Sequence, residues 1–225
     1  MLDWKNNTVV CTAVTGGYDH RASSLFIDDV DYIYFTDGKS PFQIEHPWKE
    51  IILEDSHLDN RRRSKRPKLY PHSIDILNKY KYVIWIDGDM EILKEEFIPE
   101  ILSYLENGFV ISPHFDNRTC AYGESTIRPA KYINEPLDEQ VSFYKSEGFP
   151  ENYGLYECGV SARDMKNKQV EELGKLWYEQ NIAWSYQDQV SLPYCLWKTG
   201  YKPDILPKSF RDYNWVRINA HKRED

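Results

Sequence analysis

Hydrophobic residues in the first half of the chain gather in short runs, each followed within two residues by glycine or aspartate. The clearest runs are Thr8–Val14, residues 32–36 and Tyr82–Ile86. β-Branched and aromatic residues dominate them, which is typical of buried strands. The run Tyr82–Ile86 contains no charged position, so it predicts a strand covered on both faces, as at the centre of a parallel sheet.

Elsewhere, hydrophobic residues recur at the three- and four-residue spacing of helices. This spacing predicts helices over residues 95–106, 135–147, 168–181 and 188–198, and further hydrophobic runs predict strands over 48–53, 109–112 and 155–162. Pro193 lies within the last helix, so we expect that helix to be kinked or to begin late. Strands that alternate with helices predict an α/β fold, one Rossmann-like domain over residues 1–225 with a central mixed, mostly parallel sheet flanked by helices.

Two aspartates follow directly on the most hydrophobic strand. Asp87 and Asp89 flank Gly88, which permits a tight turn. Ligands of open parallel sheets lie beyond the carboxyl ends of the strands. Mg²⁺ and Mn²⁺ suit one or two carboxylates combined with phosphate oxygens of a substrate. The alternative is a simple Asp-Gly hairpin turn, which the uniformly hydrophobic strand disfavours.

A basic run over residues 61–68 precedes this strand. Such runs are typical of nucleic-acid or nuclear-localisation patches, but the formal net charge of -8 argues against a nucleic-acid partner. We expect residues 61–63 to lie in a solvated loop. We expect Arg66 and Lys68 to reach a bound diphosphate, whose charge fixed cations would offset.

Two further polar features are candidates for a site. His114, Arg118, Tyr122 and Glu124 follow a predicted strand and indicate either a sugar-binding wall or a hydrogen-bonded surface loop. Asp188 begins a predicted helix, where an acid is either a proton acceptor or a first-turn residue that stabilises the helix.

The overall composition is that of an ordinary globular protein, with 41% hydrophobic and 28% charged residues. The aromatic share of 15% suits binding of sugar rings and nucleobases, although any single ring is more often part of the core. The four cysteines are widely spaced, so we expect them to be reduced and mostly buried. No signal peptide or membrane-length hydrophobic run is visible, which predicts a cytoplasmic protein without a membrane span.

The order of these motifs resembles that of GT-A glycosyltransferases. The similarity is closest to a family that includes plant mucilage glycosyltransferases, and it extends to the first domain of a multi-domain glycosyltransferase of large algal viruses. It rests on TAVTGGYD at residues 12–19, WIDGD at 85–89, the spacing of the His114 to Glu124 cluster, and YQDQVSLPY at 186–194.

This resemblance implies a hexosyl- or deoxyhexosyltransferase that moves a sugar from a nucleoside-diphosphate donor, UDP-linked, to a hydroxyl of a glycan or glycoprotein. It implies Mn²⁺ or Mg²⁺ at Asp87 and Asp89, with His221 as a third ligand. The donor-side residues would be Thr12, Ala13, Tyr18, Asp37, Arg66, Lys68, Asp87 and Gly88, with Tyr18 stacking on the base and Asp37 accepting from the uracil or ribose. The viral similarity favours inversion, for which Asp188 is the first candidate base and Glu157 the second.

Two other classes of protein stay open. In phosphohydrolases the first aspartate of an Asp-x-Asp triplet is the nucleophile, but a threonine usually stands where this chain has Glu91. A carbohydrate-binding module without catalysis would bind sugar regardless of chelator or nucleotide.

Overall fold

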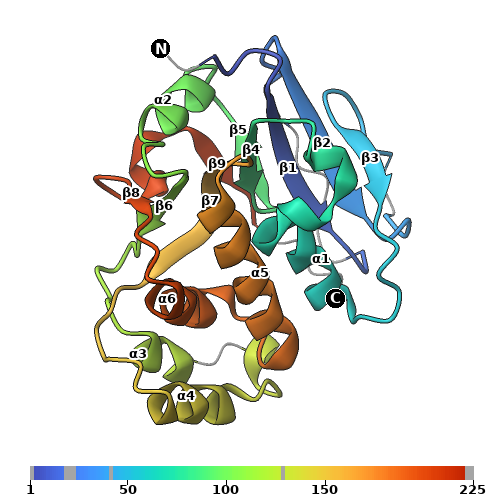
Figure 1. The fold of residues 1–225 in the computed structure, drawn as a ribbon. Helices are drawn as coiled ribbons and strands as arrows, with labels where there is room; N and C mark the ends of the chain where they lie inside the picture. The colour runs from blue at the N-terminus through green and yellow to red at the C-terminus, as the bar shows by residue number, and fades with distance from the viewer. Residues whose placement is uncertain (1–2, 18–23, 41–42, 128–129, 221–225) are drawn as a thin grey trace.

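A computed structural model describes residues 3–17, 24–40, 43–127 and 130–220. Seven strands form one sheet in the order β3-β2-β1-β4-β7-β6-β8 (Figure 1). β7 runs antiparallel to its neighbours β4 and β6, and the remaining neighbouring pairs are parallel. The strands are β1 Thr8–Val14, β2 Val30–Thr36, β3 Lys49–Ile52, β4 Tyr82–Ile86, β6 Phe109–Pro113, β7 Tyr156–Asp164 and β8 Asp204–Ile205. The predicted fold class is therefore confirmed.

Helices cover both faces of this sheet. Their bounds are α1 Asn60–Leu69, α2 Phe97–Ser103, α3 Ala121–Thr126, α4 Leu137–Ser146, α5 Lys168–Ala183 and α6 Asp188–Thr199, with 3-10 turns at Pro71–Ser73, Asp75–Leu77, Ala130–Tyr132 and Phe210–Tyr213. α1, α5 and α6 lie in front of the sheet in Figure 1, and α3 and α4 lie below α6. None of the helices in the described parts of the chain is long and apolar enough to cross a membrane.

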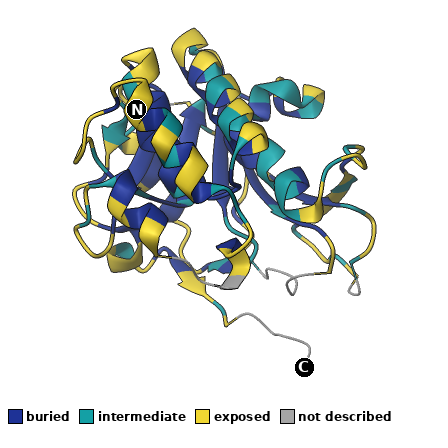
Figure 2. Cartoon of the chain, turned by 90° about the horizontal axis from the view of Figure 1, so that it is seen from below, coloured by how far each residue is buried: buried dark blue, intermediate teal, exposed yellow. Residues whose placement is uncertain are grey.

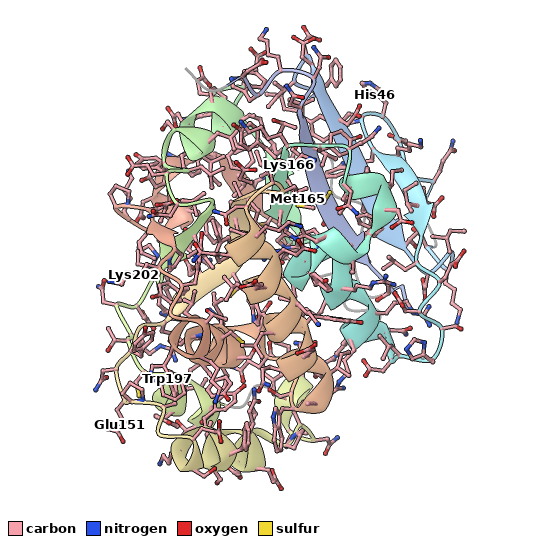
Figure 3. The ribbon with its side chains drawn as sticks, in the orientation of Figure 1. His46, Glu151, Met165, Lys166, Trp197 and Lys202 are labelled. Carbon is pink, nitrogen blue, oxygen red and sulfur yellow. The ribbon has the colours of Figure 1, made fainter. Side chains whose placement is uncertain are left out.

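The alternation of side chains along each strand creates separate cores on the two faces. Val110 of β6 belongs to the core that contains α2, whereas Phe109 and Ile111 belong to the core that contains α5 and α6. A third cluster packs Met165, labelled in Figure 3, near β1 and β4. Figure 2 shows the result, with buried strands inside and exposed residues on the outer faces of the helices.

The differences from the predicted elements have physical causes. The basic run lies in helix α1, so the solvated loop predicted for residues 61–63 is wrong. α6 begins at Asp188 and contains Pro193, so the predicted late start of this helix is also wrong. The proline ring is buried in the interior, and its packing outweighs the loss of one backbone amide donor in the helix. The predicted reduced cysteines are confirmed, since all four thiols are free and three of them are buried.

The strand ends that lead into the candidate motifs lie at one rim of the sheet. β1 and β4 are parallel, and β4 and β6 are both antiparallel to β7, so the carboxyl ends of these three strands point the same way. The start of β7 lies at the same rim, where the amide of Asp87 donates to the carbonyl of Gly159 at 2.9 Å. This is the rim at which parallel sheets place their ligands.

Candidate active site

The turn Asp87-Gly88-Asp89 leads from β4 into β5, Met90–Ile92. β4 pairs with β1 and β7, whereas β5 pairs with β9, Val216–Ile218. The two strands flanking the turn therefore do not pair with each other, and the hairpin alternative is wrong.

Close packing and the C-terminal strand fix the position of this turn. A Cβ on Gly88 would lie 2.5 Å from Cγ2 of Val14, so a larger residue would displace the turn from β1. The amide of Asn219 donates to the carbonyl of Asp89 at 2.8 Å. The indole Nε1 of Trp85 donates to Oδ1 of Asp87 at 2.8 Å.

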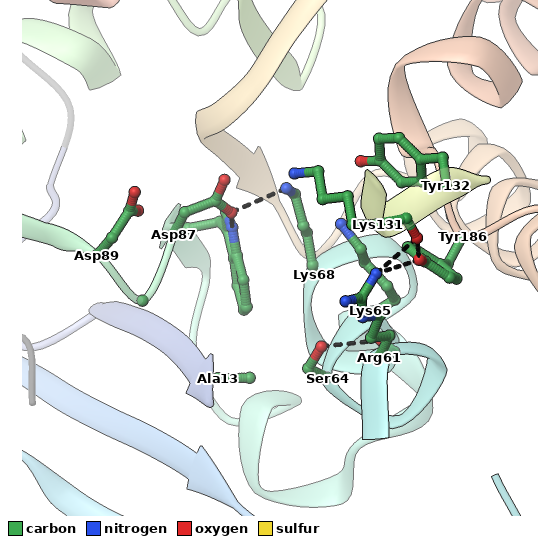
Figure 4. A pocket seen from close by; sticks show the side chains of 12 residues that line it. Ala13, Arg61, Ser64, Lys65, Lys68, Asp87, Asp89, Lys131, Tyr132 and Tyr186 are labelled. Atoms are coloured by element: carbon green, nitrogen blue, oxygen red, sulfur yellow. Dashed lines mark hydrogen bonds and ion pairs between the residues drawn. The ribbon is translucent and has the colours of Figure 1, made fainter. Parts of the chain in front are cut away.

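Beside the turn lies a cavity of about 240 Å³ (Figure 4). The two aspartates lie on one side of it, and α1 and two tyrosines lie on the other. The lining residues are Ala13, Arg61, Ser64, Lys65, Lys68, Trp85, Asp87, Gly88, Asp89, Lys131, Tyr132 and Tyr186. Acidic groups thus face a strongly basic wall across one cavity.

One face of α1 supplies that wall. Arg61, Ser64, Lys65 and Lys68 follow each other at intervals of three, one and three residues, so they share a side of the helix. Nζ of Lys65 lies 2.8 Å from Oδ2 of Asp188, and Nζ of Lys68 lies 2.7 Å from the same oxygen. We name Arg61, Ser64, Lys65 and Lys68 the pocket face of α1.

The opposite side of α1 is tied to the protein scaffold. Arg66 Nη1 lies 2.8 Å from both carboxylate oxygens of Asp55, and its Nη2 donates to the carbonyl of Ser73. Arg62 pairs with Glu135 at 2.7 Å. The expectation that Arg66 reaches the diphosphate is therefore wrong, because its guanidinium is committed to Asp55 on the other side of the helix.

Asp188, at the start of α6, is buried against both lysines. Burial alone would raise its pKa, but the charges of Lys65 and Lys68 hold the pKa far below the usual value for a carboxyl group. Conversely, burial would lower the pKa of Lys68, and the carboxylates of Asp188 and Asp87 raise it well above its usual value. Asp188 is therefore held in its anionic form and Lys68 in its cationic form, which makes Asp188 a poor proton acceptor.

A second cavity of about 240 Å³ adjoins the first, shares Lys65 and Lys68 with it, and contains Glu157 and Asp188. Glu157 is 3% exposed; its Oε1 lies 2.5 Å from Nε of Arg211, and its Oε2 accepts from Ser209. Both residues predicted as bases thus lie in the same cavity.

The predicted acceptor-side cluster forms, with one exception. Arg118 contacts both His114 and Glu124, and Glu124 accepts from Nε2 of Gln187 at 3.1 Å. Burial raises the pKa of Glu124 despite the charge of Arg118. Tyr122 instead packs in the core near α6 and donates to the carbonyl of Phe149.

The predicted donor-side residues differ in their positions. Ala13 lines the cavity, whereas Thr12 is fully buried in β1 and its hydroxyl has no partner among the described atoms. Asp37 accepts from the amide of Gly16 at 3.0 Å, and its side chain is 1% exposed, so it fixes the turn after β1. Tyr18 and His221 lie outside the described residues.

Several cavity residues escaped the sequence analysis. The rings of Tyr186 and Tyr132 contact each other at a tilt, with their centres 5.2 Å apart, and Arg61 lies over the Tyr186 ring. Lys131, the sequence neighbour of Tyr132, lines the same cavity. The pocket face of α1 had a usable signal, the helical spacing of Arg61, Lys65 and Lys68 within the basic run; Lys131 and Tyr132 had none.

Comparison with known proteins shows the family to which the chain belongs. The model of the family "TOD1/MUCI70, glycosyltransferase-like domain" matches residues 24–223. A protein of Arabidopsis thaliana named "Probable hexosyltransferase MUCI70" is 32% identical over 105 residues, which is 45% of this chain. The matched stretch covers 18% of that protein's length. Both descriptions agree with the predicted enzyme class, a glycosyltransferase. The chain belongs to the TOD1/MUCI70 family of glycosyltransferase-like domains.

Proposed function

We propose that this chain transfers a hexosyl or deoxyhexosyl group from a uridine-diphosphate sugar to a hydroxyl of a glycan or glycoprotein. The observation that carries the proposal is the arrangement of the first cavity, in which Asp87 and Asp89 face the pocket face of α1. Paired carboxylates suit a divalent cation, and a row of fixed ammonium and guanidinium groups suits a diphosphate. The name of the plant relative, a hexosyltransferase, supports the sugar-transfer part.

The carboxylates of Asp87 and Asp89 are suitable ligands for Mn²⁺ or Mg²⁺. The described residues contain no group of three His, Cys, Asp or Glu side chains that could hold a metal ion. Ions of this kind are commonly held by one or two carboxylates and by phosphate oxygens of the substrate. Asp87 and Asp89 would hold the ion, with His221 as the proposed third ligand. When bound, the cation would stabilise negative charge on the leaving diphosphate.

The residues of the chain have distinct roles in the proposed transfer. Arg61, Lys65 and Lys131 would bind the diphosphate, and Tyr132 and Tyr186 would form the apolar wall beside it. The acceptor hydroxyl attacks the anomeric carbon, the bond from that carbon to the phosphate oxygen breaks, and the diphosphate leaves with the electron pair. For inversion, which the viral similarity favours, a carboxylate takes the hydroxyl proton.

Glu157 is the better of the two candidate bases. Asp188 is held as an anion by the ammonium groups of Lys65 and the buried Lys68, so protonating it would disrupt both pairs. Glu157 pairs with a single cation, Arg211, whose side chain is 47% exposed, and it accepts a second bond only from the hydroxyl of Ser209. We therefore assign Asp188 to positioning Lys65 and Lys68, and Glu157 to proton transfer.

A thermal-shift screen of nucleotide sugars with and without Mn²⁺ tests the proposal. Ligands that bind only the native state raise its Tm by mass action, by about 5 °C or more at a hundredfold excess over Kd. We expect the largest shift with a UDP-sugar plus Mn²⁺, together with slow release of UDP. Sugar binding that is indifferent to nucleotide and chelator would instead indicate a binding module, and phosphate release from simple phosphomonoesters would indicate a phosphohydrolase.

A further inference from the structure

The ammonium group of Lys68 is wedged between two carboxylates of the site. Its Nζ lies 2.8 Å from Oδ1 of Asp87 and 2.7 Å from Oδ2 of Asp188. The side chain of Lys68 is 3% exposed and that of Asp188 is 7% exposed, whereas that of Asp87 is 37% exposed. A buried cation therefore stands beside the carboxylate that faces the cavity (Figure 4).

This contact limits what Asp87 can offer to a second cation. Its Oδ1 already accepts from Lys68 and from Nε1 of Trp85, both at 2.8 Å. A divalent ion at Asp87 would share the carboxylate with an ammonium group at hydrogen-bond distance, and like charges repel strongly where water is largely excluded.

The rest of the cavity increases this repulsion. Its lining carries four basic side chains and two carboxylates, and Asp188 adds a third carboxylate through its contacts with Lys65 and Lys68, so the balance without a donor is positive. The basic residues are Arg61, Lys65, Lys68 and Lys131. A bound diphosphate would reverse that balance and add oxygen ligands, which the described residues do not supply in a cluster of three.

We propose that Lys68 makes binding of a divalent metal at Asp87 depend on the diphosphate of the donor. This inference rests on the proposed function, because it uses the same cavity and the same ligands. Lys68 acts as an internal counter-cation that neutralises Asp87 in the empty site and keeps its contact with Asp188 when the metal and the donor arrive. Coupling between two ligands is reciprocal, so the metal strengthens diphosphate binding by the same factor.

Titration of the purified protein with Mn²⁺, followed by the paramagnetic resonance signal of the free ion, with and without UDP, tests the inference. In the unaltered protein we expect UDP to raise Mn²⁺ affinity on the order of 10- to 100-fold. In Lys68→Met, the affinity without UDP should rise by about tenfold, and the effect of UDP should shrink to about threefold or less.

Lys65→Met is the matched control. Lys65 lies on the same face of α1 and contacts the same Asp188 oxygen, but it has no contact with Asp87 among the described atoms. Its loss should change the Mn²⁺ affinity without UDP by less than about threefold. Melting curves confirm that each variant is folded.

Asp188→Asn gives a second test with the opposite sign, which also serves if Lys68→Met does not fold. Removing the carboxylate that shares Lys68 leaves more positive charge beside Asp87, so Mn²⁺ affinity without UDP should fall by about tenfold. If both variants kept the unaltered affinities and the full effect of UDP, the inference would be wrong while the proposed function stood. If neither Mn²⁺ nor UDP bound the unaltered protein, the proposed function itself would fail.

Discussion

The two sides of helix α1 use the same residue types for different purposes. On the pocket face, Lys65 and Lys68 pair with Asp188 and Asp87 around a cavity. On the opposite side, Arg66 holds Asp55, and its contacts lie within the scaffold. The sequence shows one basic run over residues 61–68, whereas the fold separates it into residues that face a ligand cavity and residues that position the helix.

This difference shows why a charge run is a weak functional signal by itself. Arg62 and Arg66, the two arginines on the side opposite the pocket face, bind loops on either side of α1. These contacts fix the rotation of the helix about its axis. That rotation decides which cations line the cavity.

The largest expected effect on turnover comes from removing one carboxylate on each side of α1, Asp89 across the cavity and Asp55 on the opposite side. Asp89→Asn should lower turnover by about 10³-fold or more with a normal Tm, because a metal ligand is worth several kcal/mol in the transition state. Asp55→Asn, which removes the partner of Arg66, should lower the Tm and leave turnover of the folded protein unchanged. Donor-hydrolysis rates and melting curves of both variants give the comparison. Full activity of Asp89→Asn would refute the site.

A smaller effect of the same kind is expected for the cations. Lys65→Met should reduce kcat/KM for the donor on the order of 10²-fold, because it removes a fixed charge beside the diphosphate. Arg66→Met should instead lower the free energy of unfolding by about 1–3 kcal/mol, since Asp55 loses a charged hydrogen-bond partner. Urea unfolding and steady-state kinetics separate the two outcomes. If Arg66→Met lowered kcat/KM as strongly as Lys65→Met, the division of α1 into two sides would be wrong.

Much of the fold could be predicted because its central elements have strong local signals. β1 and β4 were predicted with their observed bounds, and the rim that carries Asp87 followed from the parallel order of the strands. The short strands β5, β8 and β9 could not be predicted, because two or three residues carry no periodicity. Helical spacing places Lys65 and Arg66 on different sides of α1, but the rotation of the helix depends on tertiary partners, so the basic run alone could not show which side faces the cavity.

Parts of the site were beyond sequence reasoning for a similar reason. Lys131 and Tyr132 reach the cavity only because the chain between β6 and β7 folds back over α1. The pairing of Asp188 with two lysines also requires two distant segments, α1 and the start of α6, to meet. A helix-start aspartate by itself indicates neither a buried ion pair nor a base.

The smallest expected effect concerns His72, which follows α1 directly. Burial, together with the nearby charge of Arg163, lowers the pKa of His72 from 6.5 to about 4. Between these values the unfolded chain binds more protons than the native protein, so the stabilisation is complete above pH 6.5 and is lost as the pH falls towards 4. The contribution of His72 to the free energy of unfolding should change by at most about 1.4 kcal/mol per pH unit. Urea unfolding of His72→Phe at several pH values should give a free energy of unfolding whose pH dependence lacks this contribution. An unchanged slope would mean that His72 does not titrate in this way.

The central claim is that Asp87 and Asp89 hold a divalent cation against the diphosphate, opposite the pocket face of α1. The most direct measurement is anomalous scattering at the manganese edge from crystals soaked with Mn²⁺ and UDP. We predict one strong peak in contact with carboxylate oxygens of Asp87 or Asp89 and with phosphate oxygens, and the diphosphate beside Lys65. A peak elsewhere, or a UDP molecule bound away from this cavity, would contradict the account.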